Sequence, residues 1–228
     1  MTKPVVFVGM LGVLAGALAL TLTHGTAQSA DTTSPTSLAD IAQRCAASTD
    51  VSGFGSVTID KTIVSESETV TIAVPCTLHL RNGATLDIER ASLKTDKLIV
   101  ADDAAGPSSS LEIVRSAVIG AASAGLLVQL QHAGDSITVD HTSIDYPLSV
   151  FLTTQNADGS GSAGDISVTS TAISSTDPAS EGIHLIAEGT GTFKSDSFKT
   201  PADDGSAVLY AASCVMSRVT GAVPKCSP

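Results

Sequence analysis

Charged residues between positions 87 and 115 have the side-chain types of a site that processes carbohydrate. Asp87, Glu89 and Glu112 supply carboxylates, and Arg115 supplies a permanent positive charge. Two carboxyl groups that flank a glycosidic bond can act as acid and base, or as acid and nucleophile. The alternative is a solvated surface on which acids and arginines neutralise one another, each exposed pair contributing only a fraction of a kcal/mol. The residues favour this second interpretation.

A second candidate has oxygen-bearing side chains at alternate positions, Asn156, Asp158 and Ser160, followed by a glycine at the sixth position. This order resembles the start of a calcium-binding loop. The twelfth position holds Ser167 instead of the glutamate that would bind calcium through two oxygens. A flexible turn is the simpler interpretation, and we expect no cofactor.

The histidines and the acidic pairs suggest no further site. His132, His141 and His184 do not share a position in the repeat described below, which argues against a histidine metal site. Asp102-Asp103 and Asp203-Asp204 begin segments that contain glycine and serine, so turn formation explains them.

The elements that must position these residues repeat along the chain. Each copy has apolar residues at positions i, i+2 and i+7, and successive copies start about every 25 residues. The clear copies start at Leu86, Leu111, Ile137 and Ile166, and weaker copies start at Val57, Gly191 and Cys214. A second apolar segment follows in five of the copies: Leu98–Val100, Leu126–Val128, Leu148–Val150, Gly182–Leu185 and Ala207–Leu209.

These segments are rich in β-branched residues and are bounded by turn formers, as short strands are. A unit of this size cannot bury its own apolar side, but stacked units can. We therefore expect equivalent strands to pair in parallel, about 4.8 Å apart. Ile113, Val139 and Val168 should form one interior column, while Asp87 and Glu112 share an outward column.

The pattern resembles the right-handed parallel β-helix of the pectin-lyase-like superfamily over roughly residues 55 to 220. The resemblance rests on Asn82-Gly83-Ala84-Thr85-Leu86 with Ile88, and on the later alternating strands. It implies an all-β fold of about seven short coils. An antiparallel β-sandwich is the other fold considered, but it needs hairpin turns, and Asn82-Gly83 is the only Asn-Gly pair.

The resemblance carries little information about activity, because this fold serves lyases, hydrolases, adhesins and phage parts. Its lyases gather carboxylates around calcium, while an Arg or Lys abstracts a proton. The paired-Asp and Gly-His-Gly motifs of its hydrolases and the Asp-rich metal strand of its lyases are missing here. Aromatic residues that could stack on sugars are also scarce. Tyr146 and Tyr210 are the available tyrosines, and we expect the core to take most of the phenylalanines, which are Phe54, Phe151, Phe193 and Phe198 in the mature chain.

The start of the chain predicts export. Lys3 precedes an apolar run from Val5 to Leu22 and a small-residue exit, so residues 1–29 are interpreted as a secretory signal peptide. An uncleaved membrane anchor is the alternative. After cleavage, we expect a secreted chain without membrane contact.

A short helix should close the first coil within a linker and cap at residues 30–54, ahead of the β-helix at residues 55–221. Leu38, Ile41, Ala42 and Cys45 form one helical stripe, and Ser37 is the expected N-cap. Of the three disulfide pairings, we favour Cys45–Cys76, under the cap, and Cys214–Cys226, which would tether the tail at residues 222–228. Four free buried thiols are the alternative.

The charge balance limits the partners. The chain has 12 Lys+Arg against 23 Asp+Glu, a formal net charge of −11, which excludes a basic nucleic-acid binder. The sequence therefore favours a secreted binding or structural module that contacts glycans or the cell envelope. The alternative is a small lyase or glycoside hydrolase acting on acidic polysaccharide. Ice or mineral binding by a regular threonine array is disfavoured, because Val114 and Lys194 interrupt the columns.

Overall fold

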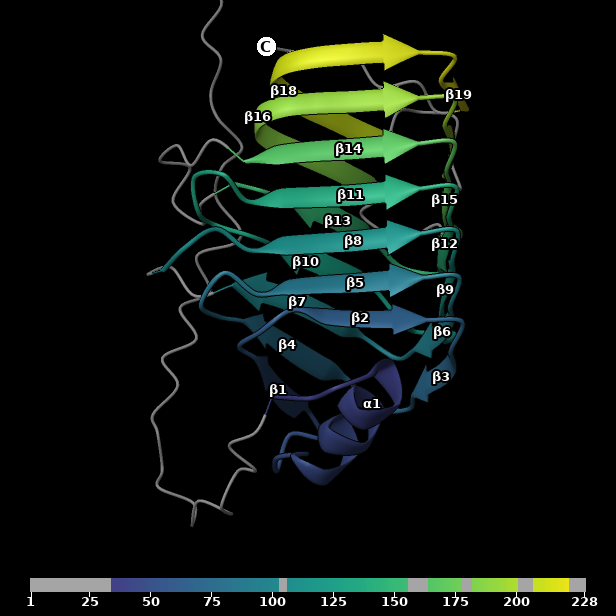
Figure 1. The fold of residues 1–228 in the computed structure, drawn as a ribbon. Coiled ribbons are helices and arrows are strands. Elements are labelled where there is room, and N and C mark those ends of the chain that lie inside the picture. Colours follow the sequence, from purple (N-terminus) through teal and green to yellow (C-terminus); the bar gives the residue numbers. More distant parts are fainter. Residues whose placement is uncertain (1–33, 103–105, 156–163, 178–181, 201–206, 222–228) are drawn as a thin grey trace, which may run out of the picture. The chain divides into compact units, whose positions relative to one another are not determined.

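The computed structural model describes residues 34–102, 106–155, 164–177, 182–200 and 207–221. Their fold is an all-β parallel solenoid of about six turns, with one short helix near its start (Figure 1). The predicted all-β parallel fold is therefore confirmed, with about six turns where about seven coils were expected. No helix among these residues is long and apolar enough to span a membrane.

Three faces make up the solenoid, and on each face equivalent strands stack in parallel. Face A contains β1 (Gly55–Ile59), β4 (Cys76–Leu80), β7 (Leu98–Asp102), β10 (Leu126–Gln129), β13 (Val150–Thr153), and the first parts of β16 (Ile183–Lys194) and β18 (Ala207–Ser217). Face B contains β2 (Ile63–Glu66), β5 (Thr85–Glu89), β8 (Ser110–Val114), β11 (Ser136–Asp140), β14 (Asp165–Thr169), and the last parts of β16 and β18. Face C contains β3 (Thr69–Ile72), β6 (Ser92–Thr95), β9 (Ala117–Gly120), β12 (Ser143–Tyr146), β15 (Ala172–Ser175), β17 (Ser197–Lys199) and β19 (Thr220–Gly221).

The interior follows the predicted periodicity. Val139 is fully buried and pairs in register with Ile113 on one side and Val168 on the other. The i+7 positions also point inward, as Leu93 and Ile144 show. The inward side chains line a small apolar cavity of about 20 Å³.

Two strand assignments made from the sequence are wrong. Ile63, not Val57, pairs with Leu86, so the segment around Val57 belongs to face A. Only three residues separate β1 from β2, so the sequence pattern grouped strands of two different faces into one copy of the repeat. In face A, the strand after Pro147 begins at Val150 instead of Leu148, and Val150 pairs with Leu126.

The predicted cap is present as α1 (Leu38–Ala47). The Ser37 hydroxyl accepts a hydrogen bond from the Asp40 backbone N–H, and the buried face of the helix packs on the first coil. The Cys45–Cys76 disulfide joins α1 to β4 as predicted. Cys214 is also disulfide-bonded, while its predicted partner Cys226 lies outside the described residues.

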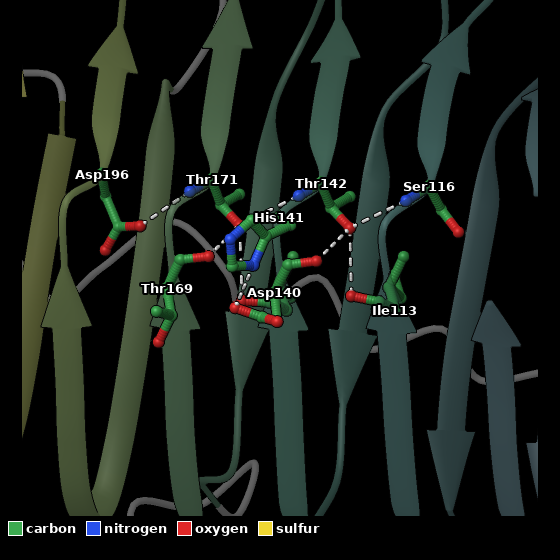
Figure 2. A network of polar contacts seen from close by, with 9 residues as sticks. Ile113, Ser116, Asp140, His141, Thr142, Thr169, Thr171 and Asp196 are labelled. Carbon is green, nitrogen blue, oxygen red and sulfur yellow. Dashed lines mark hydrogen bonds and ion pairs between the residues drawn. The ribbon is translucent and has the colours of Figure 1, made fainter. Parts of the chain in front are cut away.

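The corner between faces B and C contains a polar network, here called the corner ladder (Figure 2). At this corner each coil has one residue in the left-handed region, such as Arg115 or His141, and the next side chain then points inward. The ladder consists of these inward side chains in four successive coils: Ser116, Thr142, Thr171 and Asp196.

The side chains of Thr142, Thr171 and Asp196 each accept a hydrogen bond from the backbone N–H of the preceding coil's member. Ser116 N–H donates to Thr142 Oγ1 at 3.3 Å, Thr142 N–H to Thr171 Oγ1 at 3.4 Å, and Thr171 N–H to Asp196 Oδ1 at 3.0 Å. The Thr142 hydroxyl also lies 3.1 Å and 2.9 Å from the carbonyl oxygens of Ile113 and Asp140. The ladder therefore satisfies backbone groups that would otherwise be buried without partners.

Candidate functional site

The acidic residues singled out from the sequence lie on the outer side of face B. Asp87 and Glu112 are direct neighbours in register, and Glu89 lies two residues farther along β5. Arg115 is exposed at the corner that follows β8. Partial burial raises the pKa of the Asp87 carboxyl, and the negative charges of Glu89 and Glu66 add to this effect.

Arginine neutralises part of this surface. The Arg90 guanidinium lies 2.8 Å from the Glu66 carboxylate in the neighbouring coil and 3.7 Å from the Glu89 carboxylate. The apolar cavity lies on the opposite, inner side of the same sheet. Arg90 therefore compensates acids of two successive coils on the outer side of face B.

A different cluster lies at the corner between faces A and B. It consists of Asp102, His132 and Asp135, whose potential ligand atoms all lie within 4.8 Å of one another. Asp102 is the last residue of β7 and points inward, in register with the core residue Leu80. Asp135 directly precedes β11 and is also buried, while His132 belongs to the turn between β10 and β11.

Hydrogen bonds hold this cluster in place. Asp102 Oδ2 lies 2.6 Å from His132 Nδ1, and Asp102 Oδ1 accepts a hydrogen bond from the Gln131 backbone N–H at 2.8 Å. Asp135 accepts hydrogen bonds from the backbone N–H groups of His132 and Ser109. The side chains of Asp102 and His132 are 1% and 16% exposed, so solvent reaches the cluster from the histidine side.

Electrostatics at this corner favour an added positive charge. Burial raises the pKa of the Asp135 carboxyl, and the neighbouring Asp102 carboxylate raises it further, while the backbone hydrogen bonds from His132 and Ser109 lower it. Two buried carboxylates in contact repel each other unless a proton, a charged imidazole or a cation compensates them.

The sequence interpretation missed this cluster. A histidine metal site was expected only from histidines at equivalent strand positions, whereas His132 lies in a turn. Asp102 was assigned to a turn. Asp102 instead ends a strand on its inward side. One signal was present, because Asp102 falls in the inward alternation set by Leu98 and Val100, where an apolar residue is expected.

Face A exposes an apolar stripe, defined as the outward side chains of its last five coils. Its first column contains Ile99, Leu127, Phe151, His184 and Val208 in register. Its second column ends with Ile186 and Tyr210. The rings of Phe151 and His184 stack with centroids 4.4 Å apart, and Val208 and Tyr210 are each 40% exposed.

The stripe changes which aromatic side chains are available at the surface. Phe193 and Phe198 are buried as expected, but Phe151 faces outward, so its assignment to the core is wrong. Tyr146, by contrast, is fully buried and its hydroxyl lies 2.6 Å from Thr95 Oγ1, so it is not available to a ligand. Burial raises the pKa of the Tyr146 hydroxyl well above its usual value.

The candidate calcium loop, with Asn156, Asp158 and Ser160, lies outside the described residues, as does Asp203-Asp204. A scan against protein-family models and searches of curated proteins and of solved structures found no match to this chain.

Proposed function

We propose that this protein is a secreted binding module that contacts cell-surface glycans through the apolar stripe of face A. One observation carries the proposal: Phe151, His184 and Tyr210 present rings on the outer surface of a parallel sheet. Contiguous apolar surface on a soluble protein marks an interaction site more often than scattered single residues do.

The change in composition along face A supports this assignment. Near the cap the outward positions of the first column are polar, as at Ser56 and Thr77, and from Ile99 onward this column is apolar except for His184. Equivalent positions in the middle of face B stay polar, as at Thr138 and Ser167. Face B also exposes single apolar residues, Val64 and Val215, but face A presents a run of them in register, so binding explains this stripe better than folding does.

Sugars match this stripe chemically. Their C–H faces pack on aromatic rings such as Phe151 and Tyr210, while their hydroxyls need hydrogen-bond partners. Gln129 and Thr153 lie in the second column of face A and can supply such partners. The Cys45–Cys76 disulfide supports export, because disulfides persist in oxidising compartments.

The pectin-lyase-like superfamily remains the proposed relationship, supported by the parallel solenoid itself. Lyase or hydrolase activity on an acidic polysaccharide is less well supported. The carboxylates of Asp87, Glu89 and Glu112 lie on the outer side of a sheet, with Glu89 beside Arg90.

A glycan array probed with the secreted protein tests the proposal. We expect binding to a limited set of glycans, lost in Phe151→Ala and weakened in Tyr210→Ala. Ile119→Ala is the matched control, because Ile119 is 43% exposed but lies on face C.

Three outcomes would contradict the proposal. The array shows no binding by the parent, the loss is as large in Ile119→Ala as in Phe151→Ala, or the bound glycan is cleaved. Circular dichroism of each variant separates loss of binding from loss of fold.

A further inference from the structure

We propose that Asp102, His132 and Asp135 bind a divalent transition-metal ion at the corner between faces A and B, and that zinc is the ion best suited to them. This site is independent of the apolar stripe, because the carboxylates point into the solenoid and not outward from face A.

The spacing suits a small ion. Zinc bonds to nitrogen and oxygen are about 2.0–2.2 Å long, so two ligand atoms on one tetrahedral ion are about 3.5 Å apart. The candidate atoms lie within 4.8 Å of one another, while Asp102 Oδ2 and His132 Nδ1 are held 2.6 Å apart by a hydrogen bond whose proton the ion would replace. Small side-chain movements, in which this pair opens and the wider pairs close to about 3.5 Å, therefore complete a three-residue site.

The donor types select the class of metal. One imidazole nitrogen with two carboxylates matches zinc and neighbouring transition metals, whereas calcium takes six to eight oxygen ligands. Three protein ligands leave a fourth zinc position to water, and solvent reaches His132 at 16% side-chain exposure.

The position of the carboxylates in the fold is the second argument. Asp102 occupies an inward position in register with Leu80 of the preceding coil, and it follows Ala101, whose partner Gln129 directly precedes Leu130; both leucines are fully buried. An acid in such a column is costly unless a positive charge compensates it. Backbone N–H groups of Gln131 and Ser109 orient the two carboxylates, as outer hydrogen bonds do around metal ligands.

Calorimetric titration of zinc into protein stripped with a chelator tests the site. We expect saturable binding of one ion per chain and a rise in melting temperature of about 5–10 °C at a hundredfold excess over Kd. Calcium should produce neither effect. His132→Gln and Asp135→Asn should each weaken zinc binding by about tenfold or more.

His141→Gln is the matched control, because His141 Nδ1 also lies 2.9 Å from an aspartate, Asp140, but on an exposed surface. Its zinc affinity should equal that of the parent. The proposal is overturned if the parent shows no saturable one-to-one zinc binding, a result that does not depend on how any variant folds. Equal weakening in His141→Gln and His132→Gln also overturns it.

Discussion

Asp196 is the last member of the corner ladder and the one with a titratable side chain. Its carboxyl is 1% exposed, and within the described part of the chain its Oδ2 atom is buried without a hydrogen-bond partner. Burial raises the pKa of Asp196 to about 6, although the hydrogen bond from Thr171 N–H opposes the shift.

The raised pKa means that the folded protein holds this proton more tightly than the unfolded chain does. The stabilisation is therefore complete below the ordinary pKa of 3.8 and is lost as the pH rises through about 6. The difference between these pKa values corresponds to about 3 kcal/mol of the free energy of unfolding.

Asp196→Asn should remove this dependence. The amide oxygen can still accept the hydrogen bond from Thr171 N–H, and the amide carries no charge at any pH. Near pH 7.5 the variant should melt roughly 6–12 °C above the parent, and near pH 4 the two should melt together. Thermal melts followed by circular dichroism between pH 4 and 8 measure the difference.

The carboxyls of Asp87 and Asp135 also have raised pKa values. Both residues are present in the parent and in the variant, so their effects on stability cancel in the difference between the two melting temperatures. Asp60→Asn, which removes a charge at an exposed position, is the control and should not reproduce the rise in melting temperature near pH 7.5. If the difference in melting temperature between parent and Asp196→Asn is constant from pH 4 to 8, the account of this residue is refuted.

Three further predictions concern the core, face B and the ladder. Val139→Asp should prevent folding, because it buries a charge at a fully buried site, and export of a protein that melts like the parent would contradict this. Glu112→Gln should change the unfolding free energy by less than about 0.5 kcal/mol, with no effect of calcium on the melting of parent or variant. A calcium-induced rise in the parent that disappears in Glu112→Gln would instead favour a metal or catalytic site. Thr142→Val should cost about 1–3 kcal/mol in denaturant unfolding, because Ser116 N–H loses its acceptor, whereas Thr138→Val on the outer surface should cost much less.

The alternation of apolar and polar residues predicted which side chains point inward on the faces of the solenoid, but not at its corners. Within a strand, successive side chains point to opposite sides, so the inward direction of Val139 follows from its neighbours. At the corner between faces B and C, a left-handed residue such as His141 resets this alternation. The following residue, Thr142, then points inward, which alternation alone does not indicate.

The cluster of Asp102, His132 and Asp135, at the corner between faces A and B, depends on contacts between coils. Asp102 and His132 are 30 residues apart and meet only because β7 and β10 stack in register. Residue type also misled the assignment of Phe151, because a phenylalanine in an apolar strand suggests the core. Its neighbours Val150 and Leu152 take the inward positions, which leaves Phe151 outside.

Nuclear magnetic resonance of the labelled protein, titrated with the best glycan from the array, tests the central claim most directly. The proposed binding mode predicts that the largest chemical-shift changes map to the outward residues of face A, among them Ile99, Leu127 and Phe151. Changes confined to Asp87 and Glu112 on face B would contradict it and place the ligand on the acidic surface instead.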